Sequence, residues 1–422
     1  MPIALAHALP QSVGAVPLTV ILTLLIGLFL AVDAVSGRRA RSLIRARSAT
    51  TRPPQPDPDP APANAVEEPQ HATGMTLGLA GLVAIVLLAT FGPADPAENL
   101  TDRFVLTLLW GFVGISSIIL GSWWWRVDPL RGLNRGLAIA TGDPDQRSVS
   151  PLSPTLATSA AITGLLAWAY VQLFVTASVL TFQLLLIAYL AVHLIGTSRY
   201  GSDWLRRTES LTVLSDTLGM ARPSTTNATT NATTSLITIP DSDRLRWICG
   251  TLIGWSLVDL VIETEWWHDL ALTGATKTWL GTGLLLIAVA AICLLIRAVS
   301  GTGLGPAFVS VAAGWVVAHY LSLLMIEGQG IPIWLSDPFS TGANYLGRSG
   351  SLINLQPVGV DVLAVAQAIP FVAGHLAAVV ILDRRAATVL NDPRYLGPTT
   401  FLARAVIAVA LIGGTYLQLG GL

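Results

Sequence analysis

Ten long apolar runs constrain this chain more than any other feature of its sequence. A bilayer core about 30 Å thick is crossed by a helix of about 20 mainly apolar residues. Runs of that kind lie near residues 13–35, 75–92, 104–125, 155–177, 179–197, 247–264, 278–296, 306–326, 360–382 and 398–419. The fourth and fifth runs adjoin, so we expect a tight turn between Thr176 and Thr181. The pattern predicts an all-α, polytopic transmembrane helical bundle of about ten spans.

The composition supports a lipid partner and excludes several classes of protein. Hydrophobic residues make up 52% of the chain and charged residues 12%, whereas soluble domains carry about 25% charged residues. The basic residues are spread between apolar runs and form no single patch, so we expect no nucleic-acid partner. The only two cysteines, Cys249 and Cys293, lie inside apolar runs. They cannot supply a disulfide framework, a haem attachment motif or an iron–sulfur ligand set.

The basic residues alternate between connecting segments. Segments 36–74, 126–154, 198–246, 297–305 and 383–397 hold six, four, six, one and three arginines, twenty in all. The other side holds only Arg103, Lys277 and Arg348. Because short loops rich in Lys and Arg stay in the cytoplasm, we expect a multi-pass protein of a prokaryotic cytoplasmic membrane with both termini outside. The first run is expected to be a retained signal-anchor, since GRRARSLIRAR follows it; cleavage after AVDAVSG is the alternative.

The same pattern divides the chain into five parts. Residues 1–35 are the outer N-terminus and first span, 36–74 a disordered cytoplasmic linker rich in Pro and acidic residues, and 75–197 spans two to five. Residues 198–246 are a cytoplasmic loop with the low-complexity tract STTNATTNATTS, and 247–422 are spans six to ten. The outer loop 327–359 is long, and such loops often serve as lids. We expect it to cover an outer cavity, the alternative being a passive cover over helix ends.

Few ionisable residues fall inside the predicted spans, and each is a functional candidate because a charge in hydrocarbon is costly. Asp259 lies twelve residues into the sixth span and His319 thirteen into the eighth. Both therefore rise about 18–20 Å from the inner ends, which predicts one buried polar site. Glu263 and Glu327 lie nearer the outer surface. His375 is expected in the inner half, where it either bonds a neighbouring helix or brackets a path with His319.

No local motif fixes the chemistry. The ligand spacing His-Glu-x-x-His, a Gly-x-Ser-x-Gly turn and a phosphate-binding loop do not occur in the sequence. Any functional site must therefore be assembled from residues on different helices.

Several longer stretches are similar to one known family. AHYLSLLMIEGQ followed by SDPF, and GHLAAVVILDRRA in the next span, resemble the integral-membrane family of fenitrothion hydrolases. SDWLRRTESLTVLSDTLG resembles the amphipathic stretch after that family's fifth span, and VDLVIETEWW its acid-containing sixth span. AHAL near the N-terminus also fits, through His7. The resemblance covers most of residues 190–385.

The resemblance implies hydrolysis of a phosphotriester-type bond. The positions that match polar residues of the family are His7, Asp259, His319, Gln329 and His375. The chain departs from the family at Glu327, where the family has glutamine, and at Thr208, where the family has glycine before glutamate. Glu327 is therefore not carried over as a family ligand.

Two functions of different class follow as expectations. The first is a membrane hydrolase in which Asp259 and His319 are catalytic and a divalent metal ion is held by Asp259, His319, His375 and His7. In this hypothesis Gln329, Glu327 and Glu263 bind a small-molecule substrate. The second is a transporter in which the same groups relay protons or bind a solute. A structural subunit of a membrane complex is the third alternative.

Overall fold

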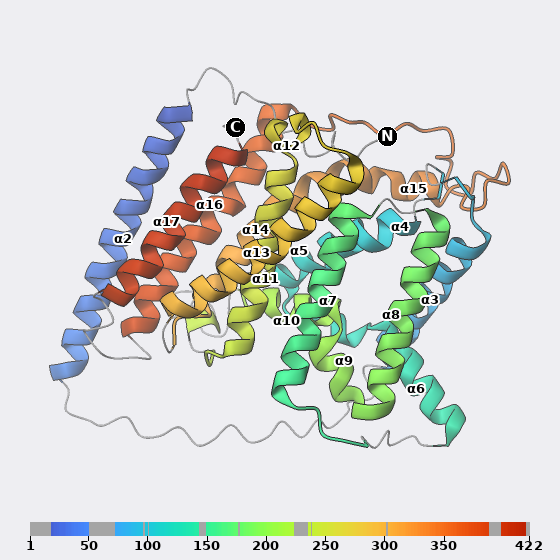
Figure 1. Cartoon of the computed structure of the whole chain (residues 1–422), viewed down its shortest axis with the longest axis horizontal. Helices are drawn as coiled ribbons and strands as arrows, with labels where there is room; N and C mark the ends of the chain where they lie inside the picture. The colour runs from blue at the N-terminus through green and yellow to red at the C-terminus, as the bar shows by residue number, and fades with distance from the viewer. Residues whose placement is uncertain are drawn as a thin grey trace.

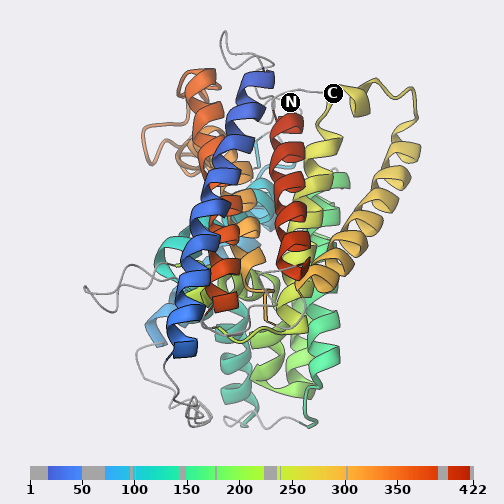
Figure 2. The same ribbon diagram turned by 90° about the vertical axis from the view of Figure 1, so that its left-hand side faces the viewer.

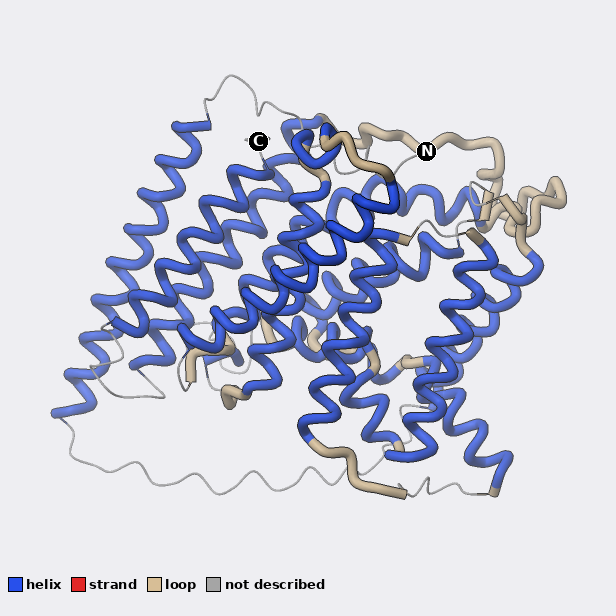
Figure 3. The backbone as a smooth tube through the Cα atoms, viewed as in Figure 1, coloured by secondary structure: helices blue, strands red, loops and turns tan. Residues whose placement is uncertain are grey.

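The computed structural model describes residues 18–49, 72–95, 98–99, 101–142, 149–175, 178–222, 235–237, 239–300, 303–387 and 398–418. Figure 3 shows these residues as helices joined by loops, with no strand among the residues drawn in colour. The predicted all-α, polytopic membrane bundle is confirmed. Nine of the described helices are long and apolar enough to cross a membrane, and α17 adds a shorter apolar stretch, Leu402–Thr415.

The ten spans follow the predicted runs closely. Nine are single helices: α2 (Leu18–Ala49), α3 (Ala72–Phe91), α7 (Pro154–Phe174), α8 (Val179–Tyr200), α11 (Asp243–Ile262), α13 (Gly274–Ser300), α14 (Ala307–Ile326), α16 (Val360–Arg385) and α17 (Pro398–Gln418). The third span is composite, with α4 (Thr101–Arg103), the π-helix η2 (Phe104–Leu109) and α5 (Trp110–Leu120). The predicted turn between the fourth and fifth spans lies between Phe174 and Val179, where the Ser178 hydroxyl accepts from the Thr181 amide.

Short helices complete the described chain. They are η3 (Trp124–Arg126), α6 (Pro129–Thr141), α9 (Ser202–Thr208), α10 (Ser210–Gly219), η4 (Ser235–Ile237), α12 (Glu265–Asp269), η5 (Glu327–Gln329) and α15 (Gly330–Trp334). In Figure 1 the first turn of α2 and the last turn of α17 lie at the same end of the bundle, together with α12 and α15. We call this end the opposite face, because it lies opposite the end that carries most of the arginine-rich segments. The other end, which carries α6, α9 and the last turns of α2 and α16, is the basic face.

Two of the predicted connecting segments contain helices that the sequence analysis did not expect. Helix α2 continues to Ala49, so residues 36–49 are helical and not part of a disordered linker. The arginines, alanines and leucines of this stretch favour helix. Segment 198–246 holds α9, α10 and η4, and the side chains of α10 are almost all buried. Residues 50–71 and the tract 223–234 lie outside the described residues.

The core of the bundle is built around α14. Fifteen of its twenty residues are buried, and it packs against α16, α11 and α5. Figures 1 and 2 show α2 and α17 at one edge of the molecule, while α3 and α8 form the other edge in Figure 1. A helix buried on all sides shows no sharp apolar stripe, which agrees with the almost uniformly apolar sequence of α14.

Glycines set the closest helix crossings. A Cβ atom placed on Gly314 would lie 2.7 Å from the carbonyl oxygen of Pro370, and one on Gly374 would lie 2.4 Å from that of Ser310. Helix α11 approaches α13 in the same way, because a Cβ on Gly254 would lie 2.7 Å from the Cα of Val289. Small residues at such positions allow helices to pack tightly in lipid, where apolar burial gives little drive.

An ion cluster joins the three helices at one edge of the bundle. The Arg404 side chain on α17 contacts Asp383 on α16, and its Nε atom lies 2.9 Å from Oδ1 of Asp33 on α2. Asp383 is fully buried. An isolated charge at this depth is unstable, and these three residues compensate one another.

A buried arginine closes the basic face. Arg385, 1% exposed, donates from Nη1 to the carbonyl oxygens of Leu236, Ile237 and Ile239 at 2.8, 2.9 and 2.9 Å. It also donates from Nε to Gly303. One guanidinium with its fixed fork of donors thus holds η4 and the α13–α14 connection against α16.

The glycine crossing gives a direct stability prediction. We expect Gly314→Leu to lower the thermal unfolding temperature of the purified protein, because the added side chain meets the α16 backbone, and overpacking costs about 1–3 kcal/mol or more. Gly81→Leu on α3 is the matched control, since a Cβ atom there meets nothing within 4 Å. Equal unfolding temperatures for the two variants would contradict the close crossing.

Candidate functional site

Asp259 and His319 lie side by side in the core of the bundle. The Nδ1 atom of His319 on α14 is 2.9 Å from Oδ2 of Asp259 on α11. Asp259 is 8% exposed, and the His319 side chain is 22% exposed. A carboxylate within hydrogen-bond distance of Nδ1 orients the ring and stabilises the imidazolium form. The structure therefore brings together the two residues that the sequence predicted to meet.

The two helices carry their polar residues to one level because both begin at the basic face. Helix α11 starts at Asp243, with Ser242 accepting from the Leu245 amide as its N-cap. Asp241 fixes the start of α14 relative to α11, because its Oδ2 accepts from the amides of Gly303 and Gly305 at 2.7 and 3.2 Å. The buried carboxylate is paired with Arg246 in the first turn of α11. This connection sets the register of the Asp259–His319 contact.

Glu263 belongs to the same group of charges. It follows Ile262, the last residue of α11, and lies one turn beyond Asp259 toward the opposite face. Its carboxylate is close enough to both Asp259 and His319 for their charges to act on it. The group therefore contains two acidic residues and one histidine, which we call the outer cluster.

Gln329 and Glu327 have other partners in the structure. The Gln329 amide donates to the carbonyl oxygens of Met325 and Asn354 at 2.9 and 3.0 Å, and its oxygen accepts from the Asn354 amide at 3.1 Å. It thus ties the long loop to the end of α14. The charges that act on Glu327 are those of Arg103 and Asp102 in α4. The binding roles expected for these two residues stay predictions.

His375 is a core residue away from the outer cluster. It is fully buried, its Nδ1 lies 2.8 Å from the carbonyl oxygen of Phe371 one turn earlier, and its ring packs against those of Phe371 and Trp315. Its Nε2 has no hydrogen-bond partner. These contacts suit a structural histidine, the alternative that the sequence left open.

The described residues do not form the expected metal centre. No group of three or more His, Cys, Asp or Glu side chains suited to a metal ion occurs among them. A site composed of Asp259, His319 and His375 is therefore not present in this part of the chain. His7, the fourth expected ligand, lies outside the described residues.

A polar connection that the sequence analysis missed runs beside the outer cluster. The hydroxyl of Tyr320, the residue after His319, donates to Oε1 of Gln172 on α7 at 2.8 Å. The Gln172 amide nitrogen and the Trp168 indole, 3.1 Å away, both donate to the carbonyl oxygen of Leu106 in the π-helix. A glutamine in the middle of an apolar run was the signal available in the sequence.

Three tryptophan rings pack on the basic-face side of this connection. Trp110 stacks on Trp168 with 4.9 Å between ring centroids and lies 5.1 Å from Trp255. Trp255 precedes Asp259 by one helical turn toward the basic face. Trp110 is fully buried and the other two rings are nearly so. The rings form an apolar layer below the outer cluster.

A second buried polar group, also missed, lies on the far side of the tryptophan layer. Glu209, between α9 and α10, accepts from the hydroxyl of Tyr189 on α8. The Tyr189 ring contacts Trp168 and His193, with centroids 6.0 and 4.5 Å away. Asp128, the N-cap of α6, acts electrostatically on both Glu209 and Tyr189. The sequence analysis treated 198–246 as a loop and so expected no buried acid there.

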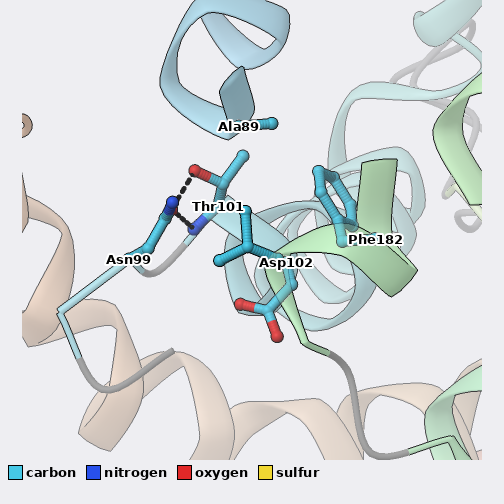
Figure 4. Close-up of a pocket in the computed structure, with 6 residues that line it drawn as sticks. Ala89, Asn99, Thr101, Asp102 and Phe182 are labelled. Atoms are coloured by element: carbon cyan, nitrogen blue, oxygen red, sulfur yellow. Dashed lines mark hydrogen bonds between the residues drawn. The ribbon is translucent and has the colours of Figure 1, made fainter. Parts of the chain in front are cut away.

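A small cavity opens between the ends of α3, α4 and α8 near the opposite face (Figure 4). It is lined by Ala89, Asn99, Thr101, Asp102, Val179 and Phe182. The Asn99 side chain accepts from the backbone amide and the hydroxyl of Thr101, which shapes the turn into α4. The long loop approaches here, since the Ser340 hydroxyl donates to Glu98 at 3.0 Å, but it supplies none of the six lining residues.

Comparison of the chain with protein-family models, with curated proteins and with solved structures gave no match. The fold and the buried clusters define a polytopic α-helical membrane protein with ionisable groups at two depths. Those buried ionisable groups are the basis for the activity proposed below.

The Asp259–His319 contact predicts a measurable coupling. In a double-mutant cycle with Asp259→Asn and His319→Gln, we expect an interaction free energy of about 0.5–3 kcal/mol, because the two side chains touch in a desolvated site. Unfolding of the wild type, the two single variants and the double variant, each purified in the same mild detergent, gives the four free energies of the cycle. His268→Gln, in the short helix α12, is the control. Its change in the free energy of unfolding should simply add to that of Asp259→Asn, with no interaction free energy. Additive free energies for the Asp259 and His319 changes would argue against the contact.

Proposed function

We propose that this protein is a proton-linked transporter of a prokaryotic cytoplasmic membrane and that Asp259 and His319 form its outer proton-binding site. The observation that carries the proposal is the Asp259–His319 contact at 2.9 Å between two buried helices. Ionisable residues inside membrane spans are rare, and paired acid and histidine groups are typical of proton relays. Glu263 extends the group toward the opposite face.

The layer of Trp110, Trp168 and Trp255 supports a transport role. A site that communicates with one side of the membrane at a time needs a barrier on its other side. The three packed rings supply an apolar barrier between the outer cluster and the basic face. In this proposal a change in helix packing at the layer opens the site to the second side.

The orientation is part of the proposal. The basic face carries the segments with twenty of the arginines, and such segments remain in the cytoplasm. The opposite face, with Glu263 and the long loop, then lies outside together with both termini. The transported partner is a small solute that moves with or against protons.

A membrane hydrolase is the second candidate, and the geometry of the same pair favours it specifically. A carboxylate on Nδ1 fixes the tautomer in which Nε2 is the basic nitrogen, which is the arrangement of a general base that activates water. The resemblance to fenitrothion hydrolases points to a phosphotriester-type ester. A divalent metal ion would need ligands beyond Asp259 and His319, and His7 is the one that the sequence suggests.

Proteoliposomes test the transport proposal. With a pH-sensitive dye inside and an imposed potential, we expect the wild-type protein to carry protons. We expect Asp259→Asn and His319→Gln each to reduce the rate by about 10²-fold or more, the usual scale for loss of a proton-transfer group. His375→Gln is the control within the same bundle, and its rate should stay near the wild-type value.

Two further measurements on the same variants distinguish a hydrolase from a transporter. Mass spectrometry measures bound metal, and a chromogenic phosphotriester measures ester hydrolysis. Proton flux unchanged in both variants, together with loss of ester hydrolysis, would replace the transporter by the hydrolase.

The orientation predicts which residues an impermeant reagent reaches. We expect Ser349→Cys in the long loop to react with an impermeant maleimide in intact cells, and Ser202→Cys at the start of α9 to react only after lysis. Both serines are exposed, and the native Cys249 and Cys293 are buried. The reverse labelling pattern would invert the proposed topology.

A further inference from the structure

A pair of buried carboxylates lies in the half of the bundle nearer the basic face. Glu209 links α9 to α10 and Asp128 precedes α6, and each is 1% exposed. Figure 1 places α10 within the bundle beneath α5, and α9 between the lower ends of α7 and α8. The two acids thus come from connections that a sequence reading assigns to the membrane surface. We call Asp128, Glu209, Tyr189 and His193 the inner cluster.

Both carboxylate oxygens of Glu209 accept hydrogen bonds from protein donors. Its two oxygens accept from the amides of Leu211 and Thr212 at 2.9 and 2.5 Å, which caps α10. The Tyr189 hydroxyl is a third donor. These three donors give both carboxylate oxygens of Glu209 hydrogen-bond partners at the start of α10.

Asp128 has no such set of donors. Its Oδ1 accepts from the Leu130 amide at 2.9 Å, but its buried Oδ2 has no hydrogen-bond partner. Burial raises the pKa of Asp128 well above its ordinary value, and the neighbouring Glu209 charge raises it further; the amides of α6 and Arg131 oppose the shift only in part. Helix α6 packs against α9, and η3, which lies just before Asp128, packs against α10, so the two carboxylates lie in one buried region. Two ionised acids in the same desolvated region repel each other, which favours protonation of one of them.

We propose that the inner cluster is a second proton-binding site, in which Asp128 carries the proton and Glu209 the charge, and which exchanges that proton with the cytoplasm. The exchange with the cytoplasm rests on the proposed transport function, whereas the protonation of Asp128 does not.

The other groups around the pair fit this assignment. Arg131 on α6 is the nearby cation, and its side chain lies over the Trp125 ring with 4.6 Å to the centroid. Asp216 on α10 is paired with Arg206 at 3.4 Å. The Trp204 indole donates to Nδ1 of His193 at 3.2 Å, so that nitrogen carries no proton and His193 is neutral. Arg131 therefore offsets the raised pKa of Asp128 only in part.

The position of the site gives it a place in the transport path. Tyr189 bonds Glu209 and contacts the edge of Trp168, and Trp168 shares the Leu106 carbonyl with Gln172. The outer and inner clusters thus contain buried acids on opposite sides of the tryptophan layer. Buried ionisable groups in a series are typical of proton relays.

Infrared spectroscopy of the full-length protein in lipid nanodiscs tests the protonation. At neutral pH we expect the wild-type spectrum to contain a protonated-carboxyl stretch that Asp128→Asn removes. In Glu209→Gln the same band should disappear at a lower pH than in the wild type, because the neighbouring charge is gone. Identical wild-type and Asp128→Asn spectra in this region would overturn the proposal.

Thermal unfolding as a function of pH gives a second readout. A carboxyl with a raised folded pKa binds more protons in the folded state, so wild-type stability falls as pH rises from the ordinary pKa to the raised one. Asparagine resembles the protonated acid and keeps the cap of α6. The unfolding temperature of Asp128→Asn relative to wild type should therefore increase with pH. Ser202→Ala, at an exposed site in α9 that carries no ionisable group, should show a constant difference.

The proteoliposome assay then tests the exchange role. If protons pass through the inner cluster, Asp128→Asn loses steady proton flux in either direction although its unfolding temperature at neutral pH is no lower than that of the wild type. Wild-type flux in Asp128→Asn would overturn the exchange role. Failure of Asp259→Asn to alter flux would instead count against the proposed function and leave the infrared result unaffected.

Discussion

The crossing of α14 and α16 at Gly314 and Gly374 is the contact on which the rest of the bundle depends. With backbone against backbone at this point, α14 lies close to α16 while its other faces pack against α11 and α5. Helix α14 can then bury fifteen of its twenty residues, and His319 reaches Asp259 on α11. In lipid, where apolar burial contributes little, such close packing and the polar contacts that it allows decide which helices associate.

Two buried arginines have partners from other segments of the chain. Arg404 is compensated by Asp33 and Asp383, and Arg385 by four backbone carbonyls. Oδ2 of Asp128, by contrast, is buried without a hydrogen-bond partner, although Oδ1 caps α6. A buried polar atom left in this way is costly, so the cap alone does not account for an acid at a position where Asn or Ser also caps a helix.

Much of the fold was predictable because span length and loop charge are properties of single segments. The Asp259–His319 contact was also predictable, since both residues are the only ones of their kind at that depth. Glu209 and Asp128 were not, because α10 is too short and too polar to read as a membrane element. Tyr320 bonds Gln172 directly, and Gln172 in turn donates to the Leu106 carbonyl of the π-helix. A π turn that frees a backbone carbonyl carries no signature in the side-chain sequence.

The π-helix η2 also determines how the third span responds to changes in length. A π turn holds one residue more than an α turn, and each residue turns an α-helix by about 100°. Removal of a single residue between Phe104 and Leu109 would be absorbed by conversion of the π turn to an α turn, so α4 and α5 would keep their faces, whereas the same deletion inside α5 would rotate its two parts by about that angle. The conversion would return the Leu106 carbonyl to its own helix and remove the acceptor that Gln172 and Trp168 share. A one-residue deletion in η2 therefore leaves the direction of the third span unchanged and acts on the polar contacts beside it.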